Sequence, residues 1–342
     1  MSIQQALEKL LQHEDLQFEE MGTVMTAIMS GDATAAQIAG FLIALRMKGE
    51  TTTEIAAAAS VMRSLAVKVS VNAEPLIDTC GTGGDGKGIF NVSTACAFVL
   101  AAAGGKVAKH GNRSATSSSG SADVLEAAGA KLDLKPHQVA QCVSEIGVGF
   151  MFAPAHHGAT RYAVGPRKEL AVRTIFNVLG PLTNPAGATR QLIGVFDPRW
   201  VPKLAEVLLK LNSERAMIVC GDDGMDEISL TGPTHVAELR DGIVHTYQIC
   251  PEDFGISSTG VDALKVTSPA ASLALIKAGF ASEVEDANAL IALNAGAALY
   301  VGGLANSLAT GVTLAKHTMA SGGALAKLEE FAHFTETIGG SS

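Results

Sequence analysis

The sequence predicts an α/β protein in two parts: a small all-helical domain, and a larger α/β domain whose mostly parallel central sheet is covered by helices. Three observations predict this class. Apolar residues recur at helical spacing up to about residue 66. Short apolar runs then alternate with helical segments, and glycine-rich or polar loops separate them. Strands that alternate with helices are typical of a parallel sheet with both faces covered.

The composition supports a large folded protein. The chain has 342 residues, of which 47% are hydrophobic and 17% charged, and its net charge is −9. This length exceeds the size at which a single core usually stops growing, so two domains are expected. The net negative charge argues against non-specific nucleic-acid binding, which needs clustered lysines and arginines. Local amides and a few cations can still bind a small anion.

Cysteine spacing and hydropathy indicate the cellular setting. The five cysteines are odd in number and contain no C-x-x-C pair, so they predict neither a disulfide framework nor a zinc site. A reducing cytoplasm is therefore expected. The stretch 288–315 carries no charge and is long enough to span a bilayer, but it contains several glycines and asparagines. We expect two packed helices there and no membrane segment.

Helix-start signals place the all-helical domain at residues 1–72. Threonine capping boxes stand at 34–37 and 51–54. Gly31 and Gly49 stand where the preceding helices would end. VSVNAEP, at 69–75, resembles a connector between the two parts.

The α/β pattern begins with LIDTC, which predicts a strand, and continues through a glycine loop into an apolar helix. KVAKH predicts the second strand, and a polar loop and another helix follow. Further strands are expected at VGFMF, LIGVF and AMIVCG, with a hairpin turn at 240–242. The expected strands are 76–80, 106–110, 148–152, 192–196 and 216–221. Ligands in such sheets bind beyond the carboxyl ends of strands, where both loops stand.

The first loop, GTGGDGKGIFNVST at 81–94, favours an anion site. Glycine lacks Cβ and permits positive φ, so that several amides can converge on one anion. The N-terminus of the following helix adds a favourable dipole. Asn91, Ser93 and Thr94 can supply donors or metal-ligand oxygens. The alternative is a surface turn in which Asn91 or Ser93 only caps the helix.

The second loop, KHGNRSATSSSGSAD at 109–123, combines two cations with hydroxyl residues. Lys109 offers a point charge and Arg113 a planar fork, the usual complement of phosphate. A flexible serine-rich linker is the alternative, but the loop lies tightly between a strand and a helix. Two such loops indicate a ligand with two phosphate groups.

Adjacent carboxylates follow the strand AMIVC, in the segment GDDGMDEIS. Beside a polyphosphate, Asp226 and Glu227 are the ligands that Mg²⁺ needs. Adjacent acids in a turn are otherwise usually solvated, and Asp223 could serve in their place.

These motifs, in this order, resemble the anthranilate phosphoribosyltransferase family. QIAGFLIALRMKGET, GTGGD, FNVST, KHGNR, SGSADVLE, RTIFNVLGPLTNP and GMDEIS carry the resemblance over nearly the whole chain. It implies a helical domain and an α/β domain with the active site in the cleft, and a homodimer joined through the helical domains. It also implies that 165–185 return to the helical domain, so that 73–164 and 186–342 form the α/β phosphoribosyl diphosphate-binding domain.

The resemblance implies transfer of the phosphoribosyl group from 5-phosphoribosyl 1-diphosphate to the amine of anthranilate, in tryptophan biosynthesis. Its phosphoribosyl diphosphate contacts map to Gly81, Gly84, Asp85, Asn91, Val92, Ser93, Thr94, Lys109, His110, Gly111, Asn112, Arg113, Ser114, Ala115, Thr116, Ser117 and Ser121. Its anthranilate contacts map to Gly81, Asn112 and Arg167. Its magnesium-associated residues map to Ser93, Asp226 and Glu227. No general acid or base is assigned.

His110, Pro154, His157 and Gly180 are expected to line the acceptor pocket, although the His156-His157 pair also fits a helix start with one histidine exposed. The chain departs from the family pattern at Ile89, Ser118, Gly158, Thr160 and Cys220. Three alternatives remain: a pyrimidine-nucleoside phosphorylase, a paralogue that uses another aromatic amine, and a non-catalytic sensor of phosphoribosyl diphosphate.

Overall fold

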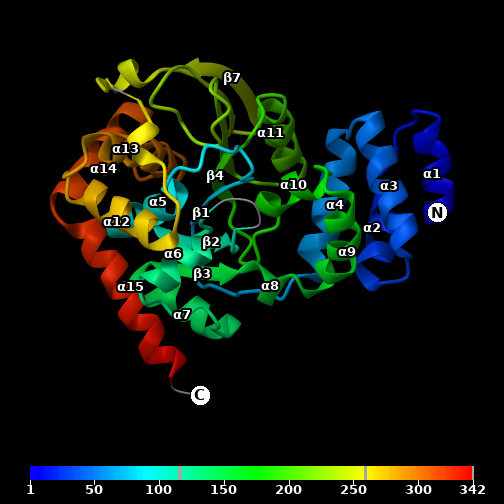
Figure 1. The fold of residues 1–342 in the computed structure, drawn as a ribbon, viewed down its shortest axis with the longest axis horizontal. Coiled ribbons are helices and arrows are strands. Elements are labelled where there is room, and N and C mark those ends of the chain that lie inside the picture. Colours follow the sequence, from blue (N-terminus) through cyan, green and yellow to red (C-terminus); the bar gives the residue numbers. More distant parts are fainter. Residues whose placement is uncertain (115–117, 258–259, 341–342) are drawn as a thin grey trace.

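The N-terminal part of the molecule is a group of helices at one end (Figure 1). The structure, a computed structural model, describes residues 1–114, 118–257 and 260–340. Both expected capping boxes are present, because the hydroxyls of Thr34 and Thr51 accept from the amides three residues on. Gly31 ends a helix in the left-handed conformation, with φ of 83°. The helices are α1 (Ile3–Leu11), α2 (Phe18–Ser30), α3 (Ala35–Lys48) and α4 (Thr52–Leu65).

A seven-stranded sheet in the order β3-β2-β1-β4-β5-β6-β7 forms the centre of the larger part. The first five strands in sequence are parallel, and β6 and β7 add an antiparallel hairpin at one edge. The strands are β1 (Leu76–Gly81), β2 (Lys106–Gly111), β3 (Val148–Phe152), β4 (Arg190–Gly194), β5 (Arg215–Gly221), β6 (Thr234–Arg240) and β7 (Ile243–Ile249). The predicted fold class is confirmed. The strand order reverses between β1 and β4, and such a switch point opens a crevice at the carboxyl ends of the strands.

Side chains of the central strands alternate between two hydrophobic clusters. On β5, Met217 and Val219 face the cluster that contains α5 and α13, whereas Ile218 and Cys220 face the one that contains α11 and the N-terminal helices. The helices that follow β1, apart from α9, are α5 (Val92–Ala102), α6 (Ser121–Ala127), α7 (Pro136–Ile146), α8 (Ala153–His156), α10 (Phe176–Leu179), α11 (Trp200–Lys210), α12 (Pro269–Phe280), α13 (Glu285–Val301), α14 (Leu308–Ala320) and α15 (Gly323–Gly339).

The uncharged stretch 288–315 forms α13 and α14, which pack against each other as predicted. Glycines allow this close approach: a Cβ on Gly311 would lie 2.2 Å from the carbonyl oxygen of Gly296. Within the described chain, no helix has both the length and the apolar character needed to cross a membrane.

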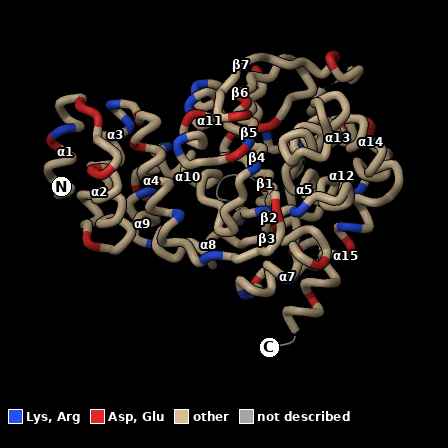
Figure 2. Tube along the Cα trace, turned by 180° about the vertical axis from the view of Figure 1, so that it is seen from behind, with Lys and Arg blue, Asp and Glu red and all other residues tan. Residues whose placement is uncertain are grey.

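The helix α9 (Arg161–Leu170) packs against α2 and α3, although the chain reaches it from the sheet (Figure 1). Its Ala163 is fully buried in the cluster that contains Phe41 of α3. The domain boundaries at residues 72, 165 and 185 stay a prediction. Figure 2 shows basic and acidic residues interspersed in both parts of the molecule.

Candidate functional site

The glycine loop after β1 is built around the carboxylate of Asp226. The amide of Gly83 donates to Asp226 Oδ2 over 2.7 Å, and a Cβ on Gly81 would lie 2.6 Å from the same oxygen. Gly194, the register partner of Gly81 on β4, would place a Cβ 1.5 Å from the main-chain oxygen of Asp226. Two neighbouring strand ends therefore need glycine so that Asp226 can lie against them. Sequence reasoning missed Gly194.

Three carboxylates lie together at this point. Glu227 Oε1 accepts from the amide of Ser93 over 3.2 Å. Burial raises the pKa of Asp226, and the nearby charge of Asp85 raises it further. Burial likewise raises the pKa of Glu227, with a second contribution from Asp226. Such crowding of oxygen ligands disfavours ionisation, and a hard divalent cation would relieve it. The donor set therefore fits Mg²⁺.

Lys109, on β2, provides a cation whose charge acts on Glu227. Its side chain is buried, and its Nζ donates to the carbonyl oxygen of Thr79 and lies 3.3 Å from Ser93 Oγ. The lysine thus stands beside the N-terminus of α5. The sequence prediction that joined the glycine loop, Ser93, Lys109 and the acidic pair in one place agrees with this geometry, while their roles as ligands of a substrate stay a prediction.

His110 contacts the protein through both ring nitrogens. Nδ1 lies 2.6 Å from Asp78 Oδ2, and Nε2 lies 2.8 Å from the carbonyl oxygen of Gly180. Because both partners are acceptors, the imidazole must be doubly protonated to donate to each. Burial alone would lower the pKa of His110, but the charge and hydrogen bond of Asp78 outweigh it and raise the pKa. His110 is thus a charged, positioned group rather than a free base.

A buried polar network supports this ion pair. Asn184 Nδ2 donates to Asp78 Oδ2 and to the carbonyl oxygen of Ala108, each over 2.8 Å. Asp78, Cys80 and His110 also have the spacing of metal ligands. We interpret them as an ion pair beside a neutral thiol, because a proton occupies the 2.6 Å contact and burial raises the pKa of Cys80. The sequence signal for this network is the acid Asp78 inside the apolar run LIDTC, which sequence reasoning missed.

The second loop uses Arg113 within the protein. Its guanidinium pairs with Glu126 over 2.6 Å and with Asp123 over 3.0 Å, both on α6. Asp123 also accepts from the amides of Ser114 and Gly120. The expectation that Arg113 offers a free fork for phosphate is therefore not what the structure shows. Ala115, Thr116 and Ser117 lie outside the described residues.

The start of α6 is packed tightly against the end of β2. Ser121 Oγ donates to the carbonyl oxygen of Asn112 over 3.3 Å, and a Cβ on Gly111 would lie 2.1 Å from this hydroxyl. Asn112 Oδ1 in turn accepts from the amide of Arg113. Gly111 is thus required by packing, whatever it binds.

The start of α5 has one unpaired hydroxyl. Thr94 Oγ1 is buried and has no hydrogen-bond partner among the described residues. Asn91 stands at the N-cap position of α5, but its side chain does not cap the helix; its Oδ1 accepts from Ser119 Oγ and Ser272 Oγ. Val92 is 1% exposed, so its side chain belongs to the core. Of these predicted contacts, Thr94 keeps the most freedom to bind a ligand.

The expected acceptor residues lie on separate elements. Arg167, on α9, stands 4.9 Å from the Phe176 ring, and its guanidinium makes no hydrogen bond or ion pair within the described residues. Burial lowers the pKa of Arg167. Both His156 and His157 are buried, so the idea of one exposed histidine is wrong. His157 Nε2 has no hydrogen-bond partner in the part of the chain that the structure describes, and burial lowers the pKa of His157 to about 4.

Residues that depart from the family pattern have protein partners of their own. The hydroxyl of Ser118 donates to the carbonyl oxygen of Val266 over 2.8 Å, and that of Thr160 to the carbonyl oxygen of His157 over 2.7 Å. Cys220 is buried on β5.

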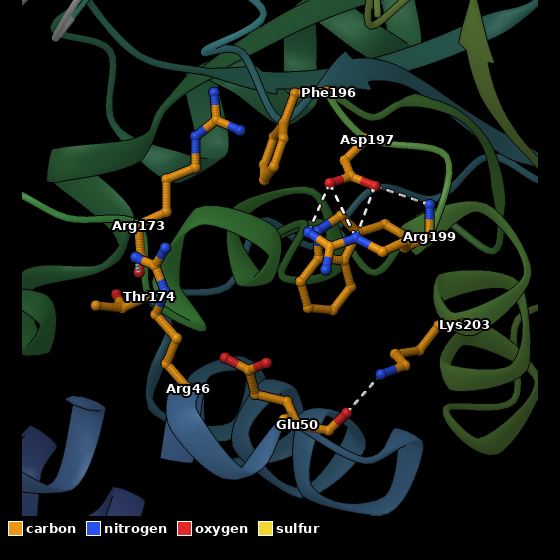
Figure 3. Close-up of a pocket in the computed structure, with 10 residues that line it drawn as sticks. Arg46, Glu50, Arg173, Thr174, Phe196, Asp197, Arg199 and Lys203 are labelled. Carbon is orange, nitrogen blue, oxygen red and sulfur yellow. Dashed lines mark hydrogen bonds and ion pairs between the residues drawn. The ribbon is translucent and has the colours of Figure 1, made fainter. Parts of the chain in front are cut away.

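A cavity of about 320 Å³ lies between the end of α3 and the start of α11 (Figure 3). Arg173 lines it and reaches the glycine loop, where its Nη2 donates to the carbonyl oxygen of Gly84 over 2.5 Å. Sequence reasoning missed this contact, because nothing in the spacing of RTIFNVLG indicates it. The cavity is lined by Arg46, Gly49, Glu50, Arg173, Thr174, Phe196, Asp197, Arg199, Trp200 and Lys203.

Comparison with known proteins identifies the family. Residues 4–66 match the helical bundle domain of a glycosyl transferase family, and residues 73–325 match its a/b domain. The chain is 58% identical to the anthranilate phosphoribosyltransferase of Teredinibacter turnerae, over 98% of this chain and 99% of that protein. It is 57% identical to that of Cellvibrio japonicus, over 99% and 100%.

Solved structures agree with this relationship. The anthranilate phosphoribosyltransferase of Thermus thermophilus superposes with a TM-score of 0.91 and 43% identity, over 97% of this chain and 99% of that one. The enzyme of Saccharomyces cerevisiae in complex with PRPP and Mg has a TM-score of 0.87 and 26% identity, over 98% of each chain. The chain belongs to the anthranilate phosphoribosyltransferase family.

Proposed function

We propose that this chain transfers the phosphoribosyl group of 5-phosphoribosyl 1-diphosphate to the amine of anthranilate, giving N-(5-phosphoribosyl)anthranilate and diphosphate. The observation that carries the proposal is the glycine loop closed around Asp226, with Glu227 and Ser93 beside it. The names of the relatives favour this reaction over a nucleoside phosphorylase. Tryptophan biosynthesis in the cytoplasm is the corresponding setting.

The reaction needs little proton chemistry. The neutral amine of anthranilate attacks C1 of the ribose, a C–N bond forms, and the bond from C1 to the diphosphate oxygen breaks with inversion. The proton of the resulting ammonium leaves to solvent. Negative charge develops on the diphosphate as it leaves, and preorganised hydrogen-bond donors can stabilise this charge. We assign no general base to this step. His110 cannot accept the proton, because both of its ring nitrogens already donate to oxygen atoms.

Magnesium is the cofactor that the carboxylates would hold. Asp226 and Glu227, with Ser93 beside them, would be its protein contacts, and Asp85 stands close to Asp226. When bound, the ion would neutralise charge on the diphosphate. The enzyme of Saccharomyces cerevisiae is in complex with PRPP and Mg, which supports this assignment. Chelation by EDTA should abolish transfer, and added Mg²⁺ should restore it.

Backbone amides and a few side chains would bind the phosphoribosyl diphosphate. We assign the glycine loop, Thr94 and Lys109 to direct contact, because Thr94 has an unpaired hydroxyl and Lys109 stands at the start of α5. Arg113, Asn91 and Ser121 would act by holding the loops in place, since protein partners already occupy them.

Arg167 is the candidate clamp for the carboxylate of anthranilate, because its partly desolvated guanidinium makes no hydrogen bond or ion pair within the described residues. Arg167→Ala should raise the KM for anthranilate by about tenfold or more and leave that for phosphoribosyl diphosphate nearly unchanged. Arg161→Ala is the matched control: it lies on the same helix, is exposed, and contacts Tyr162. Equal losses for both substrates would contradict the assignment.

A homodimer through the helical domain is part of the proposal. Leu11 and Met47 on that domain are 70% and 76% exposed, which is unusual for large apolar side chains and suits a partner surface. Light scattering after size-exclusion chromatography should give twice the chain mass, and Met47→Glu should shift it toward the monomer. A monomeric wild type would contradict this part.

The deciding experiment follows the fluorescence of anthranilate on mixing with enzyme, phosphoribosyl diphosphate and Mg²⁺, with each component omitted in turn. A fluorescence loss that requires all components supports the function. Binding of phosphoribosyl diphosphate without any loss would overturn it, in favour of another aromatic amine or of a sensor. Trials with other aromatic amines then separate those two.

A further inference from the structure

We propose that Arg173 is a positioning residue for the glycine loop, which orients one of the amides meant for the diphosphate and ties the loop to helix α3. The inference rests on the proposed function for the identity of the anion. It concerns a residue that makes no contact with the carboxylates of the site and was not among the predicted substrate contacts.

The guanidinium of Arg173 is fixed from two sides. Its Nη2 donates to the carbonyl oxygen of Gly84 over 2.5 Å, and its carbon lies 3.9 Å from the centre of the Phe196 ring. The Phe196 amide donates to Thr82 Oγ1 over 3.2 Å, so the aromatic residue under the guanidinium is itself attached to the loop. Arg173 therefore contacts the loop directly at residue 84 and indirectly at residue 82. Figure 3 shows the guanidinium of Arg173 beside the Phe196 ring.

The peptide that Arg173 holds is the one that carries the Asp85 amide. In a planar trans peptide the C=O and the following N–H point in opposite directions. Fixing the oxygen of Gly84 toward Arg173 thus directs the amide of Asp85 away from Arg173. This matters because Gly83 and Gly84 have φ of 64° and 77°, a glycine conformation in which peptide planes reorient easily. A reoriented peptide would present a carbonyl oxygen where the anion needs a donor.

The same residue connects the loop with the N-terminal helices. Arg46, in the last turn of α3, donates from Nη1 to the carbonyl oxygen of Arg173. The main chain of Arg173 is thus held by the helical part while its side chain holds the loop. A change in the position of α3 would be transmitted to the Gly84 peptide through these two contacts.

A second arginine in the same cavity provides a matched control. Arg199 pairs with Asp197 over 2.7 Å and is largely exposed, and within the described residues none of its hydrogen bonds or ion pairs reaches the loop. Replacing either arginine with methionine removes one positive charge from the cavity. A general electrostatic effect on an anionic ligand would therefore appear in both variants, whereas a positioning effect would appear only in Arg173→Met.

The test measures binding of diphosphate in the presence of Mg²⁺ by calorimetry, for the wild type, Arg173→Met, Arg173→Lys and Arg199→Met. Loss of a charge-assisted hydrogen bond should weaken binding to Arg173→Met by about tenfold. Arg173→Lys, which can still donate one hydrogen bond, should recover part of the affinity, and Arg199→Met should stay within about twofold. Thermal unfolding identifies any variant that fails to fold. If Arg173→Met fails to fold, the diphosphate affinities of Arg173→Lys and Arg46→Met are compared with that of the wild type instead.

Kinetics separate positioning from a merely structural role. Arg173→Met should raise the KM for phosphoribosyl diphosphate and leave that for anthranilate unchanged, while a structural defect would lower only the apparent kcat. Diphosphate affinity in Arg173→Met within twofold of the wild type, an equal loss in Arg199→Met, or no binding to the wild type would overturn the inference. The binding measurement needs no turnover. A wild type that binds diphosphate but transfers no phosphoribosyl group would therefore refute the proposed function and leave the inference on Arg173 standing.

Discussion

The two loops at the carboxyl ends of β1 and β2 are built in opposite ways. The glycine loop has little side-chain chemistry of its own, and it closes its backbone around the carboxylate of Asp226. The second loop is rich in cations, but His110 pairs with Asp78 and Arg113 pairs with Asp123 and Glu126. A count of charges in the sequence therefore overstates how many cations of the second loop are available to an anion. The same count takes no account of the backbone amides that the first loop offers.

Breaking the support of the second loop should have the largest effect. Asp78→Asn leaves the buried imidazolium of His110 without its counter-ion and should reduce the free energy of unfolding by about 3–5 kcal/mol. The pKa of His110 is raised in the folded protein. The pair therefore stabilises the fold fully below the ordinary pKa of histidine, and this stability is lost as the pH rises through the pKa of His110 in the folded state. Urea denaturation between pH 5 and pH 9 measures both the loss of stability in Asp78→Asn and the pH dependence of the wild type. An unchanged midpoint in Asp78→Asn would refute the ion pair.

The buried His157, on which the charge of His110 acts, should show the opposite pH dependence. The pKa of His157 is lowered to about 4 by burial and by the charge of His110. Its stabilising contribution is present above its ordinary pKa and is lost as the pH falls through about 4, by about 3 kcal/mol. NMR titration of the imidazoles should show His157 titrating far below His110. Similar midpoints for the two would contradict the environment described for each.

Blocking the glycine loop should chiefly affect activity. In Gly81→Ala the new Cβ would lie 2.6 Å from Asp226 Oδ2, so that the carboxylate must move. We expect kcat/KM to fall by about a hundredfold, with a weaker dependence on Mg²⁺. Gly86→Ala is the control: Gly86 has φ of 74° and open space around it, so this variant adds backbone strain without a clash. A similar loss in both would show that the loop tolerates no side chain at either position, so that the clash with Asp226 would not be the specific cause.

Arg113→Ala should have the smallest effect. Because its guanidinium is exposed and paired with α6, its removal should change the KM for phosphoribosyl diphosphate by less than about threefold. Lys109→Met, which removes the buried cation of the same loop, should raise this KM by about tenfold or more. Steady-state kinetics at saturating anthranilate compare them. A larger effect for Arg113→Ala would reverse the comparison between the loops.

Local patterns predicted most of the fold. The capping boxes of Thr34 and Thr51 and the parallel strands follow from short-range sequence signals, and the structure contains them. The fourth strand was predicted at 192–196, whereas β4 begins at Arg190 and ends at Gly194. The prediction followed the apolar run and missed a polar strand start: Arg190 pairs with Glu214, so a charged residue can begin the strand.

The sequence by itself determined the alternation of strands and helices, the placing of both loops at strand ends, and the set of residues from which the site is made. The alternation of elements follows from the periodicity of apolar residues, and the loops follow from the positions of glycine. Both signals act over a few neighbouring residues. Only the tertiary structure decided which charges are free. Asp78 meets His110, Asp123 and Glu126 meet Arg113, and Arg173 meets Gly84 through contacts that depend on packing between elements. Pairing depends on distances in space, and the sequence lists only the partners that could pair.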